Sequence, residues 1–229
     1  MRQLGSDPVS RSSSQLGDDR QLSFAQVLEH EIQEEVAELN QRLTSDQFPG
    51  FSIETDDADV KLTKQVGDST VVVRFSVSSS LSEWRADSTD QDNQQAQTPS
   101  SSDQQQVGFT YSLLSLPDFQ VQIIRNGRTF EVSCYFEELE HDEETGEPYS
   151  SDPVFHVDEV VLYEGEPKET EFAVSTEYFR DELQDGLFQY LTEHGIDDEF
   201  SKNLVAFATN YEKRQYIGLM KRLKEFVAK

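Results

Sequence analysis

The sequence predicts an α+β protein in which a consecutive antiparallel sheet of about seven strands is flanked by N-terminal and C-terminal helices. Three observations predict this class. Apolar residues recur at helical spacing near both ends of the chain, and they alternate with polar residues through its middle. The alternating segments are joined by connections too short for parallel pairing, which needs long crossovers.

The first 21 residues are rich in Ser, Gln, Asp and Arg and have no apolar periodicity. We therefore predict a disordered N-terminal arm over 1–21, followed by one domain over 22–229. The arginines and serines of the arm are typical of a mitochondrial presequence, whereas its three aspartates are not. Besides a plain disordered arm, a presequence and a remnant downstream of a removed one are the alternatives.

The first helix is predicted over 23–44. Ser23 and Gln26 have the spacing of a capping box, and an apolar stripe at helical spacing follows them. The helix is expected to stop before Pro49.

Strands are predicted where apolar and polar residues alternate. Asn126 and Gly127 separate two such runs, which is a strong hairpin signal because both central turn residues need positive φ. A low-complexity loop over 82–106 interrupts the sheet, and a second, acidic loop spans 137–152. The expected strands are 51–55, 60–66, 71–77, 107–116, 119–124, 128–136, 154–163 and a short one near 171–174.

The helical period returns at Thr176. The first C-terminal helix is expected to end at His194-Gly195, with Gly195 in the left-handed conformation. Asp197 is expected to cap a second helix that continues toward Val227, with a bend near Asn210.

Several of these segments carry a family pattern. It consists of the opening helix Phe24…Leu28…Glu31-Ile32, the strand Val71-x-Val73-x-Phe75-x-Val77, the hairpin Phe119-x-Val121-x-Ile123-x-Arg125-Asn126-Gly127 with Cys134 after it, and Leu187-x-x-Tyr190-Leu191-x-x-His194-Gly195-Ile196-Asp197-x-x-Phe200 followed by Tyr216, Leu219, Leu223, Lys224 and Phe226. In this pattern and in its acidity the chain resembles the mitochondrial glycoprotein family. Its members are also described as mitochondrial acidic matrix proteins and, in animals, as complement q-subcomponent-binding proteins.

The resemblance implies a seven-stranded antiparallel sheet with helices from both chain ends. It also implies a doughnut-like homotrimer with asymmetric charge, located in the mitochondrial matrix. Family members bind many partners without known catalysis, and they are linked to mitochondrial translation, ribosome assembly and oxidative phosphorylation. The chain departs from the family in its 82–106 and 137–152 loops.

The charge of the chain indicates the kind of partner. It has 45 Asp and Glu against 19 Lys and Arg, a formal net charge of −26. This excess argues against nucleic-acid binding, which depends on Lys and Arg, and favours basic proteins, basic peptides or metal ions. The acid-rich region from Glu137 to Glu171 is either an anionic patch for basic partners or a solvated loop that keeps the protein soluble. The candidate partner-binding residues are Glu137, Glu138, Glu140, Asp142, Glu143, Glu144 and Glu147.

The last 28 residues, 202–229, differ from the rest of the chain in charge, since seven Lys and Arg against two Glu give them a net +5. Basic side chains at the end of a helix complement its dipole. Alternatively, they pair with the acidic face at Glu29 to Glu38, within one chain or between subunits.

No motif of a catalytic, cofactor or metal site is present. The acidic turns at Asp56 and Asp142 lack the ligand spacing of an EF-hand, the four histidines have no ligand spacing, and Cys134 is expected to be a small core residue. No apolar run is long enough to span a membrane. Charge and the lack of motifs predict a non-catalytic acidic scaffold or chaperone-like binder of basic proteins with no cofactor, and the resemblance implies that these are mitochondrial proteins, with ribosomal proteins among the candidates. A low-affinity divalent-cation buffer is the alternative.

Overall fold

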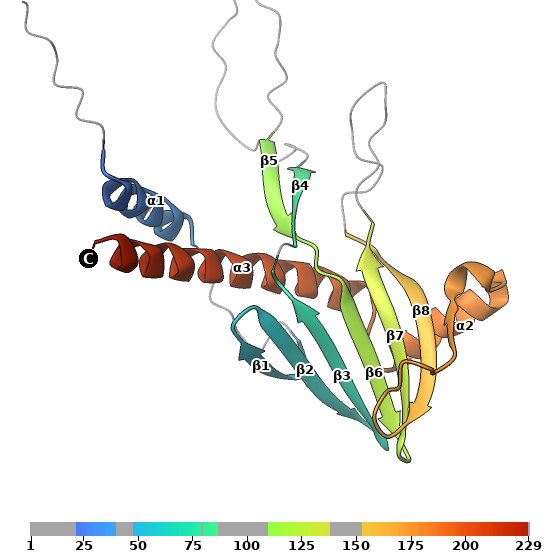
Figure 1. The fold of residues 1–229 in the computed structure, drawn as a ribbon. Coiled ribbons are helices and arrows are strands. Elements are labelled where there is room, and N and C mark those ends of the chain that lie inside the picture. Colours follow the sequence, from blue (N-terminus) through green and yellow to red (C-terminus); the bar gives the residue numbers. More distant parts are fainter. Residues whose placement is uncertain (1–21, 40–47, 79, 87–109, 138–152, 229) are drawn as a thin grey trace, which may run out of the picture.

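The computed structural model describes residues 22–39, 48–78, 80–86, 110–137 and 153–228. Three α-helices and a seven-stranded antiparallel sheet make up most of this part of the chain, as Figure 1 shows. The helices are α1 (Phe24–Glu38), α2 (Asp181–Glu193) and α3 (Asp198–Val227), with a short 3-10 turn, η2 (Thr176–Tyr178), before α2. The strands are β1 (Ser52–Asp56), β2 (Asp59–Val66), β3 (Ser69–Ser76), β4 (Leu81–Ala86), β5 (Thr110–Ser115), β6 (Phe119–Arg125), β7 (Arg128–Phe136), β8 (Phe155–Glu164) and β9 (Ala173–Ser175).

The sheet confirms the predicted class. Its strand order is β1-β2-β3-β6-β7-β8-β9, and every neighbouring pair is antiparallel. The β6–β7 hairpin turns where the sequence predicts it, because Asn126 and Gly127 have φ values of 53° and 76°. A register shift between Ser133 and Cys134 places a bulge in the β7–β8 pair.

The strand predicted over 107–116 does not join this sheet, so that prediction is wrong. Its described part forms β5, which pairs only with β4 in a separate two-stranded ribbon. In chain order the ribbon lies between β3 and β6, and these two strands pair directly with each other in the sheet. At its base, Ser80 and Ser115 share a hydroxyl hydrogen bond, and the Ser115 amide donates to Thr209 Oγ1 of α3 at 2.9 Å.

The predicted start of α1 is confirmed and its predicted end is wrong. The Gln26 amide donates to the Ser23 hydroxyl at 3.4 Å, and the Ser23 amide donates to the Gln26 side chain at 2.9 Å, which completes the capping box. The helix ends at Glu38 rather than residue 44, since Leu39 has ψ of 82°. Residues 40–47 lie outside the described residues, and the chain returns at Phe48, which is 1% exposed in the core.

The main core lies between one face of the sheet and α3. Val71, Val73 and Val121 are fully buried on the sheet side. From α3, the ring of Phe200 lies 5.5 Å from that of Phe48 and 6.3 Å from that of Phe119. Strand alternation therefore places one face of β2, β3, β6 and β7 against α3 and leaves the other face open.

The junction of α2 and α3 follows the predicted signals. Gly195 has φ of 84°, the left-handed conformation that favours glycine at the end of a helix. The Asp197 carboxylate accepts from the Phe200 amide at 2.8 Å and caps α3. The bend predicted near Asn210 does not interrupt α3, which is one 30-residue helix. The Asn210 side chain donates to the Ala206 carbonyl at 2.8 Å within the helix.

Helix α1 lies beyond the sheet, along the C-terminal half of α3 (Figure 1). Leu28 and Ile32 are buried in this contact but do not belong to the main core, and neither does Ile217 of α3. We call this contact the α1–α3 seam.

Candidate partner-binding surface

The two ends of the sheet differ in charge. At one end, Asp56, Asp59, Asp118 and Asp158 lie in strand ends, turns or the β8 bulge, and none of them forms an ion pair within the described residues. We call these four residues the acidic end. At the opposite end, two acids pair with arginines of the β6–β7 hairpin, Arg125–Asp68 at 2.9 Å and Arg128–Glu164 at 2.7 Å.

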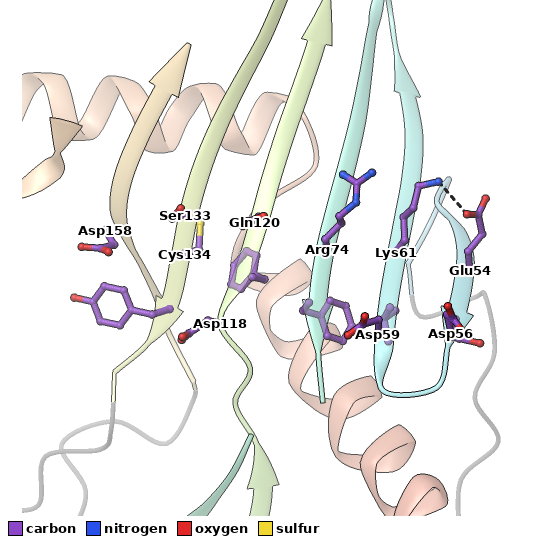
Figure 2. A pocket seen from close by; sticks show the side chains of 15 residues that line it. Glu54, Asp56, Asp59, Lys61, Arg74, Asp118, Gln120, Ser133, Cys134 and Asp158 are labelled. Atoms are coloured by element: carbon purple, nitrogen blue, oxygen red, sulfur yellow. Dashed lines mark hydrogen bonds and ion pairs between the residues drawn. The ribbon is translucent and has the colours of Figure 1, made fainter. Parts of the chain in front are cut away.

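A groove of about 1140 Å³ runs over the open face of the sheet next to the acidic end. We call it the open-face groove. Figure 2 shows Asp56, Asp59 and Asp118 at the strand ends, with a row of longer polar side chains one step inward. The inner row consists of Lys61, Arg74, Gln120 and Ser133, and Glu54 lines the groove beside Lys61.

The inner row follows from the pairing register. Lys61 lies opposite Arg74, Arg74 opposite Gln120, and Gln120 opposite Ser133, so all four point to the same face. Both cations of this row are engaged: the Lys61 ammonium lies 2.9 Å from the Glu54 carboxylate, and Arg74 donates to the Gln122 side chain. Glu54 balances the charge of Lys61, whereas Gln122 is neutral and leaves the charge of Arg74 to offset part of the acidic end.

Like charges face each other at the β1–β2 turn, where Asp56 lies directly opposite Asp59. Directly opposed like charges destabilise an antiparallel pair. The turn is nevertheless held to α3, because the Asp57 carbonyl accepts from the Tyr211 hydroxyl at 2.6 Å and from the Gln215 amide at 2.8 Å. The fold thus keeps two opposed carboxylates at the rim of the groove.

An aromatic side chain closes the other side of the groove. Tyr135 lines it, is 38% exposed, and stacks on His156 with ring centroids 5.6 Å apart. His156 in turn lies 3.0 Å from the Glu137 carboxylate. The Tyr135 ring is therefore held in place beside Asp118 and Asp158, which line the same groove.

Of the seven acids predicted to bind partners, the structure places one. Glu137 follows β7 directly and pairs with His156. The remaining six, Glu138, Glu140, Asp142, Glu143, Glu144 and Glu147, lie outside the described residues. The predicted binding residues did not include Asp118 and Asp158, which are 40 positions apart and line the same groove only because β6, β7 and β8 are neighbours.

The basic C-terminal segment pairs with α1 in the same chain, which was one of the two readings of its charge. The Lys213 ammonium lies 3.1 Å from the Glu35 carboxylate, and Lys224 pairs with Glu29. Burial raises the pKa of Glu212 in this seam, and the charge of Glu35 raises it further, while Lys213 opposes the shift.

Two residues weighed for chemistry are structural. Burial raises the pKa of the Cys134 thiol far above its usual range, so this sulfur stays protonated and unreactive. His194 is buried, and its Nδ1 lies 2.8 Å from the Tyr190 carbonyl at the end of α2. Within the described ranges, no three His, Cys, Asp or Glu side chains are grouped as a metal site requires, and no helix is long and apolar enough to cross a membrane.

A polar network crosses the open face at its centre. Glu131 accepts from the Tyr163 hydroxyl at 2.8 Å and from the Gln122 amide at 2.7 Å. Burial raises the pKa of Tyr163 to about 12, and its hydrogen bond to the negative Glu131 contributes. Tyr163 is only 5% exposed, and its hydrogen bond to Glu131 holds the hydroxyl in place.

Known proteins match nearly the whole chain. A protein of Caenorhabditis elegans named conserved regulator of innate immunity protein 3 is 31% identical over 91% of this chain and 85% of its own length. The human mitochondrial complement component 1 Q subcomponent-binding protein is 26% identical over 91% of this chain and 72% of its own length.

Solved structures share the fold. A Leishmania major protein, described as a sequence homologue of human p32, superposes with a TM-score of 0.59 over 88% of this chain and 96% of its own, at 15% identity. The Trypanosoma brucei p22 protein gives a TM-score of 0.54 over 89% and 96% of the two chains, at 13% identity. Residues 26–227 match the pattern described as mitochondrial glycoprotein, so the chain belongs to the mitochondrial glycoprotein family.

Proposed function

We propose that this protein is a non-catalytic, multi-ligand acidic scaffold or chaperone-like protein of the mitochondrial matrix that binds basic proteins. The observation that carries the proposal is the acidic end of the sheet, where four aspartates have no ion-pair partner within the described residues. The family and the names of the relatives support it, since the human relative is named as a mitochondrial binding protein.

The mechanism is electrostatic. A net charge of −26 attracts cationic proteins and speeds their encounter with this surface. Once bound, the carboxylates shield the positive charge of the partner from wrong contacts, such as those with RNA. Screening limits the field of exposed charges to about 8 Å at physiological ionic strength, so close complementarity determines which partners stay bound.

The working unit is a homotrimer, in which the total charge is three times −26, or −78. Two separate sets of exposed apolar side chains support assembly. One set, on α1 and the end of α3, includes Phe24, Val27, Val36, Leu219 and Phe226, and the other, on β8, η2, α2 and the segments between them, includes Leu162, Phe172, Tyr178 and Leu183. These elements lie on opposite sides of the molecule (Figure 1), so a contact between the two sets is heterologous and can close a ring.

The partners we propose are basic mitochondrial proteins, including ribosomal proteins. In this role the protein supports mitochondrial translation, ribosome assembly and oxidative phosphorylation, the processes that the family resemblance implies. Both the matrix location and these processes are testable by pull-down of crosslinked partners from intact mitochondria, with ribosomal proteins expected among those recovered.

Calorimetry with a purified basic protein tests the binding mode. Affinity is expected to fall steeply from low to high salt, and neutralising the acids from Glu137 to Glu147 is expected to weaken it. Binding that does not depend on salt contradicts the proposal. Sedimentation is expected to give three subunits. In a calorimetric titration with calcium, several sites of micromolar affinity would favour the alternative of a divalent-cation buffer.

A further inference from the structure

We propose that the open-face groove is an arginine-binding site for a basic partner, with the guanidinium held between Asp118, Tyr135 and Asp158. The inference rests on the proposed function and locates the binding of the basic partner in this groove. The groove differs from the acidic loop that the sequence indicates, because it is built on paired strands of the sheet.

The geometry of the groove fits a segment of polypeptide. Its volume of about 1140 Å³ is slightly above the range for small-molecule sites, which is about 300–1,000 Å³. Val60, Phe75 and Phe119 of the same strands point into the core, so the floor of the groove is polar. A polar floor with the acidic end at its rim suits a side chain with a cationic head.

The charges within the groove favour one side of it. Lys61 and Glu54 neutralise each other on the β1–β2 side. Figure 2 shows Asp118 and Asp158 on the side away from this pair, and no described cation pairs with either carboxylate. Between Asp118 and Asp158, an incoming cation therefore meets both of these carboxylates on the side of the groove away from Lys61 and Arg74.

The chemistry of the site favours arginine over lysine. The guanidinium is planar, carries five donors and stacks on aromatic rings, whereas the lysine ammonium is compact and strongly hydrated. Tyr135 offers such a ring, and its stacking on His156 fixes the ring before a partner arrives. Two carboxylates and an aromatic face are the groups that a guanidinium uses.

The test is a titration of the full-length protein against a fluorescein-labelled peptide of alternating arginine and serine, followed by fluorescence anisotropy at about 0.15 M salt. The groove variant is Asp118→Asn with Asp158→Asn. The matched control is Glu166→Gln with Glu169→Gln, which removes the same charge from exposed positions outside the groove. Circular dichroism and sedimentation verify that each variant folds and assembles.

We expect the groove variant to weaken binding about tenfold or more, since it removes two charge-assisted contacts, and the control to weaken it less than about twofold. Tyr135→Ala leaves the charge unchanged and is expected to weaken binding about threefold, while Tyr135→Phe restores it. The corresponding lysine peptide is expected to bind more weakly than the arginine peptide. If the groove variant does not fold, Asp56→Asn with Asp59→Asn takes its place, because it removes the same charge from the opposite rim of the groove. This variant is expected to weaken peptide binding less than Tyr135→Ala does.

Equal losses in the groove and control variants would overturn the inference and leave the proposed function standing, because they would mean that a diffuse field binds the peptide. Equal binding of the lysine peptide, or no effect of Tyr135→Ala, would overturn the assignment to arginine. If the unmodified protein ignores both peptides even in dilute buffer, the proposed function itself is wrong and the inference falls with it.

Discussion

Replacing Leu28 and Ile32 by alanine is expected to release α1 while the sheet stays folded. Both side chains are buried in the α1–α3 seam and neither belongs to the main core. A buried Leu or Ile replaced by Ala costs about 2–5 kcal/mol, and the lower value applies at a seam between two helices because it can relax, giving about 4 kcal/mol for the pair. Each 1.4 kcal/mol is a factor of ten, so amide protection in α1 is expected to fall by up to about a thousandfold.

Hydrogen exchange followed by mass spectrometry measures this directly, because peptides from α1, β3, β6 and β7 report separately. The freed helix has only 15 residues, which is marginal for an isolated helix, so its amides are expected to lose most of their protection. Gln33→Ala, at an exposed position of the same helix, is the control and is expected to leave exchange nearly unchanged. Sheet peptides that lose protection by the same factor as α1 would refute the reasoning, since α1 would then belong to the cooperative core.

Asp59→Asn is expected to stabilise the free protein by about 0.2–1 kcal/mol in chemical denaturation, because it removes the repulsion from Asp56; a destabilised variant would mean that the carboxylate has a favourable contact. Phe200→Ala is expected to cost about 3–5 kcal/mol, since its ring packs against three others in the core, and a cost below about 1 kcal/mol would contradict that packing. Tyr163 has its pKa raised to about 12, so it favours folding below about pH 10 and this contribution is lost as the pH rises through 12. Ultraviolet titration is expected to show a late phenolate that Tyr163→Phe removes. Burial and the charge of Glu35 raise the pKa of Glu212, so this residue favours folding at acid pH and its contribution is lost as the pH rises. Glu212→Gln is therefore expected to raise the melting temperature at pH 7. A lower melting temperature would contradict the raised pKa.

Local signals in the sequence predict the parts of the fold that depend on neighbouring residues. The capping box at Ser23, the turn at Asn126-Gly127, the left-handed Gly195 and the Asp197 cap all lie where their residue types place them. In each case a side chain or a backbone conformation within a few residues determines the structure. The alternation of the strands predicts the sheet for the same reason.

The wrong predictions concern contacts between distant residues. Nothing in the alternation of 110–115 shows that this strand pairs with β4 outside the sheet, because the choice depends on β3 and β6 pairing directly. The stripe of α1 continues past Glu38, but Phe48 is needed in the main core, and the chain must leave the helix to reach it.

The candidate site was predictable in kind but not in place. Composition alone indicates an acidic surface for basic partners, and Glu137 lies next to the surface that the structure reveals. Asp118 and Asp158 are separated by 40 positions and become neighbours on the groove only through the strand order and the β8 bulge. The amino-acid sequence alone therefore contains no pattern by which this pair of residues can be recognised.

The β4–β5 ribbon makes this protein a convenient host for added sequence. It branches off between two strands that pair directly, and its base is fastened by Ser80, Ser115 and Thr209. Because β3 and β6 pair directly, a change in the length of the connection between β4 and β5 alters no strand pairing of the seven-stranded sheet and costs little free energy of loop closure.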